Sequence, residues 1–251
     1  MQQVNKRAVA QAFGRAAQMY QQHDVLQRLC GERLLRLAAI QTPGRLLDAG
    51  CGPGGFSRHF SAGGWQVTAL DISPAMLAEA ERQASAWRYI CGDIEDIPSD
   101  IGRFDLSWSN LAVQWCANLR QAIGELVRVT RPGGQVLFST LGAESLREMR
   151  QAWCGLGAPP PVNAFRTLGA IQQQLSGLAV RWRRDELTLH FADIRLALQS
   201  LKGIGATHLH RFPARQPLTR SRLTMLAQHW PRDATGFKLT YEIILGVIDG
   251  G

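Results

Sequence analysis

The chain of 251 residues contains little cysteine, and what it has is scattered. The cysteines, with no C-x-x-C pair among them, are Cys30, Cys51, Cys91, Cys116 and Cys154. Isolated cysteines supply neither a disulfide framework nor the ligands of a structural zinc site. We therefore expect reduced thiols in the cytoplasm and no bound metal.

Long apolar runs are also missing. No apolar segment reaches the roughly 18 residues that a membrane-spanning helix needs. Residues 1–7 lack the apolar block of a secretory signal, and there is no internal repeat or low-complexity tract. Because 45% of the residues are hydrophobic, the chain can bury the core of one large domain.

Acidic residues are scarce in two segments. Residues 1–41 hold six Lys/Arg against two acids, and residues 191–236 hold seven against two, whereas the rest of the chain holds 15 against 16. The net charge of +8 therefore arises in these two segments. One reading is ordinary solvated helix faces. The other is a surface that steers an acidic partner, either nucleic acid or an acidic carrier protein.

The most informative stretch is 46–55, with the sequence LLDAGCGPGG. It predicts a buried strand, a glycine turn and a helix that begins near Pro53, because proline fits the first turn of a helix. Glycines let a ligand approach the backbone closely, and the free N–H groups of a helix start attract electron-rich ligand atoms. The turn therefore predicts a nucleotide-type cofactor site.

Asp48 helps to choose the cofactor. Gly50, Gly52 and Gly55 satisfy the G-x-G-x-x-G pattern of dinucleotide sites, but a carboxylate beside the turn would repel a pyrophosphate. S-adenosylmethionine (SAM) has no phosphate and carries an ammonium and a sulfonium, which suit Asp48 better. The stretch resembles the D-x-G-x-G motif of class I SAM-dependent methyltransferases. A glycine turn without a ligand is the alternative.

Strands and helices alternate along the chain, which predicts a doubly wound α/β fold. The resemblance implies a Rossmann-like sheet of seven mostly parallel strands with helices on both faces and an antiparallel last strand. Strands are expected at 45–49, 66–70, 88–91, 104–109, 135–141, 180–190 and 239–248. Helices are expected at about 5–18, 25–37, 53–61, 74–84, 119–128, 144–153, 168–175, 194–201 and 221–230.

We expect the whole chain to form a single domain. Its N-terminal helical arm would be 1–41, and its core would be 42–190 together with 237–251. About 48 residues separate the last two long strands, where the superfamily usually has a short hairpin. This insertion, 191–236, is long enough to form a helical lid.

Acidic residues follow the next two expected strands. Asp71 and its neighbour Ile72 are assigned to the cofactor, because an acid about twenty residues after the glycine turn accepts the ribose hydroxyls. A helix cap is the alternative for Asp71, although Ser73 suits that role better. The resemblance implies that Asp93 and Ile94 meet the adenine; a turn residue is the alternative for Asp93.

The end of the fourth strand is expected to face the methyl group. Asn110 lies there, at the edge where open α/β sheets bind ligands, and is assigned to both cofactor and catalysis. Gln114 follows closely and is expected to shape the transfer pocket, whereas Trp115 suits the core equally well. Residues 109–112 read SNLA and lack the N-P-P-Y-type motif of amide-methylating nucleic-acid enzymes. A nucleic-acid substrate is therefore disfavoured.

Two further regions contain candidate substrate residues. Tyr20 follows the first helix, where it would touch the substrate or pack on the core. The lid segment 202–210 combines two glycines, two histidines and a lysine, and we hypothesise that Lys202 or His208 orients an acidic group. Its H-x-H pattern has no further ligand cluster nearby, so metal is not expected.

The whole chain resembles the malonyl-acyl carrier protein O-methyltransferases of biotin synthesis. The match is most specific around Gln114 and across 202–210. Matching segments are 4–6, 12–17, 47–54, 108–116 and 200–210. The resemblance implies methyl transfer from SAM to the free carboxylate of malonyl-acyl carrier protein by a monomer that binds neither nucleic acid nor membrane.

This reaction needs no general base, because a carboxylate is already ionised near neutral pH. We expect hydrogen bonds or a single cation to hold it, since a stronger ion pair would quench the nucleophile. The rivals are a carboxyl methyltransferase for another small acid, similar to those acting on aconitate, and a non-catalytic SAM-binding regulatory protein.

Overall fold

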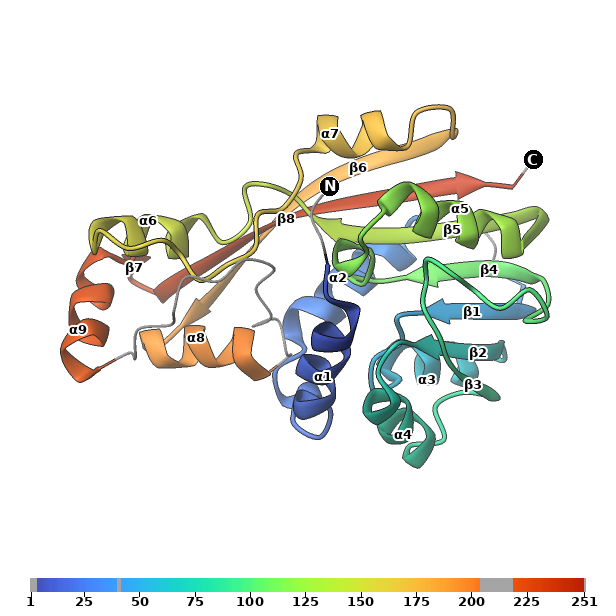
Figure 1. Cartoon of the computed structure of the whole chain (residues 1–251), viewed down its shortest axis with the longest axis horizontal. Coiled ribbons are helices and arrows are strands. Elements are labelled where there is room, and N and C mark those ends of the chain that lie inside the picture. Colours follow the sequence, from blue (N-terminus) through green and yellow to red (C-terminus); the bar gives the residue numbers. More distant parts are fainter. Residues whose placement is uncertain (1–3, 40–41, 204–218, 251) are drawn as a thin grey trace.

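The computed structural model describes residues 4–39, 42–203 and 219–250. Seven strands form one sheet in the order β3-β2-β1-β4-β5-β8-β6, and the two-residue β7 (Arg232–Asp233) pairs with β8 (Figure 1). The other strands are β1 Arg45–Ala49, β2 Gln66–Asp71, β3 Arg88–Cys91, β4 Phe104–Ser109, β5 Thr130–Leu141, β6 Val180–Phe191 and β8 Gly236–Asp249. β1 to β5 pair in parallel and β8 is antiparallel to both its long neighbours, which confirms the predicted fold class.

Helices cover both faces of this sheet (Figure 1). They are α1 Lys6–Ala16, α2 Val25–Leu35, α3 Gly55–Ala62, α4 Pro74–Arg82, α5 Leu119–Val129, α6 Arg147–Gly155, α7 Leu168–Gln174, α8 Ile194–Gly203 and α9 Arg220–His229, with 3-10 turns η1 Tyr20–Gln22 and η2 Val113–Trp115. Of the helices in the described residues, none combines the length and apolar character needed to cross a bilayer.

Adjacent residues of the central strands build two separate layers of core. Leu46 and Trp108 pack on one face of the sheet, while Leu47 and Phe138 pack on the other. Successive side chains of a strand point to opposite faces, so a strand covered on both faces is a continuous apolar run. β1 lies between β2 and β4 in the middle of the sheet. The order of the strands changes direction between β1 and β4, and open α/β sheets bind ligands at the carboxyl ends of the strands at such a point.

Side-chain caps set the starts of the helices near that edge. Asn5 accepts the backbone N–H of Ala8 at the start of α1, and Ser73 accepts that of Met76 at the start of α4. The sequence predicts the cap at Ser73. α3 begins at Gly55 and not near Pro53, because Gly54 adopts a left-handed conformation with φ 85° that cannot continue a helix.

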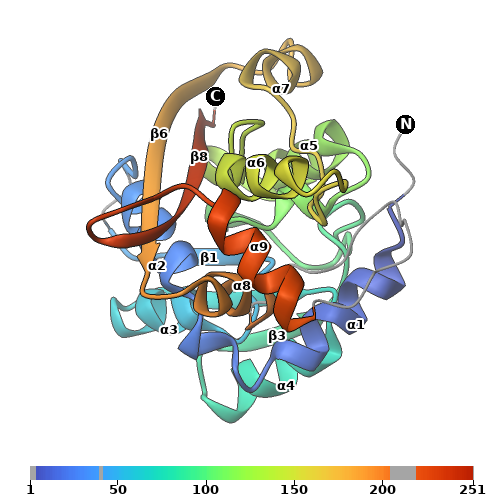
Figure 2. The same cartoon turned by 90° about the vertical axis from the view of Figure 1, so that its left-hand side faces the viewer.

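The arm lies beside the first part of the sheet. A side-chain atom added at Gly14 of α1 would lie 3.2 Å from Ser73 and 3.3 Å from Ala75 of α4, so the two helices touch closely. Figure 2 shows α1 next to α4 on the side of the molecule away from β6. The N-terminal helix is therefore part of the wall around the sheet's ligand edge.

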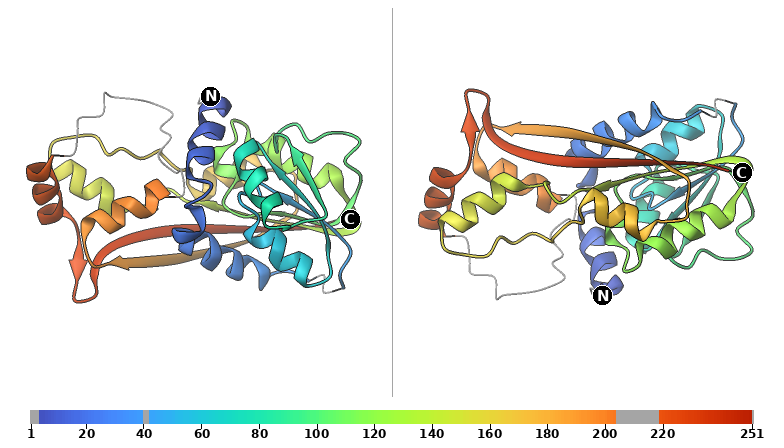
Figure 3. Two further views of the ribbon diagram at one scale, coloured as in Figure 1. Left: turned by 90° about the horizontal axis from the view of Figure 1, so that it is seen from below. Right: turned by 90° about the horizontal axis from the view of Figure 1, so that it is seen from above.

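The C-terminal half of β6 and the N-terminal half of β8 extend beyond the rest of the sheet and support α6, α8 and α9 (Figures 1 and 3). We call this group of three helices the distal lobe. Trp153 of α6 and Trp230 after α9 form an edge-to-face pair with 6.2 Å between ring centroids. The sequence assigns α6 to the core segment, but the structure packs it against a helix of the expected lid.

Candidate functional site

The glycine turn after β1 contains three left-handed residues, of which Gly50 and Gly52 face the site and Gly54 precedes α3. Gly50 has φ +81°, and a side chain there would lie 2.3 Å from Ala112. Gly52 has φ +55°, and a side-chain atom there would meet nothing within 4 Å. Both glycines line one cavity at the carboxyl edge of the sheet. Gly50 therefore makes room for the neighbouring strand end, and Gly52 leaves an open cradle beside the cavity.

Asp71 ends β2 and lines the same cavity. Its Oδ2 accepts the N–H of Gly52 at 2.9 Å, and its Oδ1 accepts the N–H of Ser73 at 2.8 Å. Burial raises the pKa of Asp71 to about 6, although these two hydrogen bonds act to lower it. Each carboxylate oxygen keeps a lone pair, so the group is held rigidly and can still accept two ribose hydroxyls.

Asp48 lies behind the glycine turn and not among the residues that line the cavity. Its Oδ2 accepts a hydrogen bond of 2.6 Å from Ser57 of α3. Burial, and after it the charge of Asp71, raise the pKa of Asp48 to about 7. Asp48 thus joins β1 to α3, and its predicted contact with the cofactor stays a prediction.

The N-terminal arm contacts the segment that follows β3. Lys6 of α1 pairs with both Asp93 and Glu95, the latter at 2.8 Å. All three residues line the cavity. Burial acts to lower the pKa of Lys6, but its hydrogen bonds to the two carboxylates raise it overall. Asp93 was predicted as a site residue, whereas its partners Lys6 and Glu95 were not.

Apolar side chains form much of the remaining wall. Ile72 and Ile94, predicted to touch the cofactor, both line the cavity, as do Met76 and Leu111. Phe13 of α1 also lines it and stacks edge to face on Trp115, with 5.2 Å between ring centroids. A planar, weakly polar ring would find apolar surface here, while the carboxylates face the polar part of a ligand.

Asn110 occupies the end of β4 and ties three segments together. Its Nδ2 donates to the carbonyl of Gln27 at 2.8 Å, and its Oδ1 accepts from Ser139 at 2.8 Å. The Ser139 hydroxyl also accepts the N–H of Leu111, which has φ +50°. Asn110 lines the cavity, so the structure places it with the predicted cofactor residues and explains how it is held.

Tyr20 reaches the same cavity from η1. Burial, with the nearby charges of Asp71 and Asp24, raises the pKa of its hydroxyl well above the usual value. The phenol is therefore neutral near pH 7. The structure brings Tyr20 to the cavity that the glycine turn and Asp71 also line. The sequence left open whether Tyr20 touches the substrate or packs on the core.

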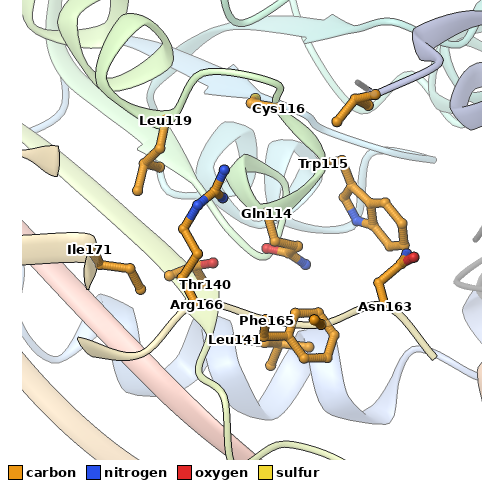
Figure 4. A pocket seen from close by; sticks show the side chains of 12 residues that line it. Gln114, Trp115, Cys116, Leu119, Thr140, Leu141, Asn163, Phe165, Arg166 and Ile171 are labelled. Atoms are coloured by element: carbon orange, nitrogen blue, oxygen red, sulfur yellow. The ribbon is translucent and has the colours of Figure 1, made fainter. Parts of the chain in front are cut away.

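A second cavity adjoins the first, because Trp115 and Cys116 line both. Gln114 lies in this second cavity, and Figure 4 shows the Arg166 side chain extending between Leu119 and Gln114. Gln114 donates through Nε2 to the carbonyl of Leu111 at 2.7 Å. The predicted transfer residue Gln114 therefore faces a chamber next to the cofactor cavity.

The two lid candidates are not brought to the site. Lys202 lies in the last turn of α8, and its side chain is outside the part that the structure describes. His208 lies outside the described residues altogether. Their proposed grip on the substrate stays a prediction. Arg166, which the sequence did not suggest, sits in a loop that carries no motif.

The fold and the site together match one class of enzyme. Residues 47–138 match the family model of a methyltransferase domain. A putative methyltransferase from Bacillus halodurans has a TM-score of 0.60 and 16% identity, and covers 87% of this chain and 97% of its own. The plantazolicin methyltransferase has a TM-score of 0.56 and 16% identity, and the match covers 98% of this chain and 95% of that protein. The chain has the fold of the class I SAM-dependent methyltransferases, and it is an enzyme of this class.

Curated relatives identify the family within this class. Malonyl-[acyl-carrier protein] O-methyltransferase of Erwinia billingiae is 53% identical over 248 residues, with 99% of both chains covered. The same enzyme of Salmonella typhimurium is 47% identical over 249 residues, also with 99% covered. The chain belongs to the malonyl-[acyl-carrier protein] O-methyltransferase family.

The methyl donor of this class is SAM, and the first cavity fits it. The open cradle at Gly52 leaves space beside the turn, and Asp71 presents two buried acceptors suited to a cis-diol. Ile94 and Met76 offer apolar walls for a purine. The cavity therefore fits SAM, to which we assign it, and the contact of Asp71 with the ribose stays a prediction.

Proposed function

We propose that this protein transfers the methyl group of SAM to the free carboxylate of malonyl-acyl carrier protein. The product is the malonyl methyl ester on the carrier, an early intermediate toward the pimeloyl part of biotin. The observation that carries the proposal is identity near 50% along the entire length to enzymes named for this reaction. The second cavity beside the cofactor cavity supports it, because an acceptor needs its own space.

The chemistry asks for positioning and not for proton transfer. SAM supplies a methyl group activated by a sulfonium. A malonyl carboxylate oxygen forms the new bond to the methyl carbon as the sulfur–carbon bond breaks, and S-adenosylhomocysteine leaves without a charge on sulfur. Because the carboxylate is ionised near pH 7, the protein has only to align it and exclude water.

The acidic carrier would dock on the two basic segments, the arm and the lid. Figure 1 supports this arrangement, because α1 and α8 both lie along the lower side of the molecule. Six basic residues against two acids in 1–41, and seven against two in 191–236, would attract an acidic protein. The protein would work as a monomer in the cytoplasm, without nucleic acid or membrane.

Mass spectrometry of malonyl-acyl carrier protein tests the proposal directly. After incubation with the protein and SAM, the malonyl group should gain one methyl, and omission of SAM should abolish the gain. Acetyl-acyl carrier protein is the matched control, because it lacks the carboxylate. No methylation of the malonyl carrier, with SAM binding shown separately, would refute the substrate assignment and favour another small acid, such as an aconitate-like one.

A further inference from the structure

Arg166 is a cation without a counter-ion in the described part of the chain. Some other arginines around the sheet have acidic partners: Arg147 pairs with Glu186 at 2.6 Å, and Arg184 pairs with Glu242 at 2.6 Å. Within residues 4–39, 42–203 and 219–250, no ion pair or hydrogen bond to the Arg166 side chain is found. Its backbone is fixed by a bridge to Gly142. The backbone at Arg166 is thus fixed, and the guanidinium at the end of its side chain is left available.

Gln114 contributes a second available atom to the same chamber. Its amide nitrogen is occupied by the carbonyl of Leu111, whereas its buried Oε1 has no hydrogen-bond partner among the described residues. A buried polar atom without a partner costs free energy. An N–H group of an incoming ligand would remove that cost, and the pantetheine arm that carries an acyl thioester contains amide N–H groups.

The rest of the chamber is mainly apolar. Leu119, Leu141, Phe165 and Ile171 line it together with Arg166 (Figure 4). Such walls strengthen the attraction between a cation and an anion because they exclude water. The chamber therefore combines one positive charge, one free acceptor and an apolar surface, immediately beside the cavity assigned to SAM.

We infer that Arg166 binds the malonyl carboxylate and aims it at the cofactor cavity, with Gln114 accepting an amide N–H of the pantetheine arm. This inference rests on the proposed function. It gives Arg166 the role that the sequence suggested for Lys202 or His208. A guanidinium fork binds one lone pair on each carboxylate oxygen, and each oxygen keeps another lone pair for attack on the methyl group.

A single cation also accounts for selectivity. An acetyl thioester has no carboxylate to pair with Arg166, so it would gain nothing from the positive charge. The methyl ester formed in the reaction is neutral and loses the same interaction, which favours its release. One arginine thus distinguishes the substrate both from the unsubstituted acyl group and from the product.

Two substitutions test the inference. Arg166→Gln removes the charge with little change in volume, and Arg166→Lys keeps the charge but loses the fork. Each variant is assayed with malonyl-acyl carrier protein and with a small malonyl thioester of N-acetylcysteamine. We expect Arg166→Gln to lower kcat/KM by about 100-fold with both substrates, and Arg166→Lys to recover part of the loss. The dissociation constant of SAM, measured by calorimetry, should change less than about twofold.

Arg181→Gln is the matched control. Arg181 pairs with Asp249 on the outer strands of the sheet and does not line the chamber, so it reports general loss of positive charge and should keep wild-type kcat/KM.

A loss by Arg166→Gln confined to the carrier substrate would overturn the inference, because it would make Arg166 a docking residue. Normal turnover of Arg166→Gln with the small thioester would overturn it too. Failure of the wild-type protein to methylate either malonyl substrate would instead refute the proposed function.

Discussion

Asp71 is the carboxylate that we expect to hold the ribose of SAM. Its two oxygens are oriented by the N–H groups of Gly52 and Ser73, and it lies at the rim of the cavity where β2 ends. Asp48, only two residues before the glycine turn, faces Ser57. The two acids are therefore held by different partners, and the cofactor contact that the sequence predicts for each of them stays a prediction.

We predict that Asp71→Ala weakens SAM binding by about 100-fold. Hydrogen bonds to a charged group are worth about 1.5–3 kcal/mol, and the ribose would lose both of its acceptors. Isothermal titration calorimetry of SAM measures the change. Asp100→Ala, which removes an exposed carboxylate from the same half of the chain, should bind SAM as the wild type does. Unchanged affinity in Asp71→Ala would remove Asp71 from the ribose site.

The same carboxylate predicts a dependence on pH. Since the pKa of Asp71 is raised to about 6, the group takes up a proton as the pH falls through 6. The protonated form is a poorer acceptor for the diol, so SAM affinity should be high at pH 7 and drop about tenfold by pH 5. Titrations at both pH values measure it, and Asp71→Asn should show a much flatter profile. Equal wild-type affinity at pH 5 and pH 7 would contradict the prediction.

Among the elements, α1 acts as a strap across the cofactor cavity. Lys6 joins it to Asp93 and Glu95, and Phe13, two turns further on, stacks on Trp115. Both contacts connect the N-terminal arm to segments about a hundred residues later in the chain. The cavity is therefore complete only when α1 is in place.

We predict that Lys6→Gln accelerates SAM dissociation and weakens its binding about tenfold. The substitution leaves Asp93 and Glu95 without their cation and loosens α1, while the fold of the sheet stays intact. Stopped-flow measurement of cofactor release tests this. Arg7→Gln is the control, because Arg7 is exposed on the next position of α1 and does not line the cavity. An equal effect of both substitutions would indicate general electrostatics and not the strap.

The elements show which features local sequence can predict. β1, β3 and β4 were predicted to the residue, because each is a short segment that ends directly before a glycine or an asparagine. β1 and β4 are mostly buried, whereas β3 is a partly exposed edge strand. η1, η2 and β7 were missed, since two or three residues carry no periodicity. β5 begins at Thr130 and not at 135 as expected, and so includes residues 131–134 (RPGG), where its pairing with β4 shifts register. The longer β5 depends on its pairing with β4 and β8, which lie elsewhere in the chain, whereas η1, η2 and β7 are formed by local contacts.

The site follows the same division. The common cavity of Asp71 and Asn110 was predictable, because parallel strands bring their carboxyl ends to one edge, whereas their roles stay predictions. The pairing of Lys6 with Asp93 spans 87 residues, and Arg166 enters its chamber from a loop. Neither has a local signal, so tertiary structure was needed to find them.

At the scale of the whole molecule, charge is distributed unevenly between the core and its two basic segments. We predict that kcat/KM for malonyl-acyl carrier protein falls steeply between about 0.05 and 0.5 M salt, because added ions screen the attraction between the basic surface and the acidic carrier. The small malonyl thioester makes no such surface contact and should respond weakly. Steady-state assays with both substrates test this, and equal slopes would contradict docking on the basic segments.

The distal lobe is assembled from two separate excursions of the chain. α6 arises between β5 and β6, whereas α8 and α9 arise between β6 and β8, and Trp153 meets Trp230 across the join. A chimaera that imports 191–236 from a distant methyltransferase would therefore set a foreign helix against the resident Trp153. Successful grafting calls for both insertions to travel together, and natural divergence of this lobe should show the two segments changing in step.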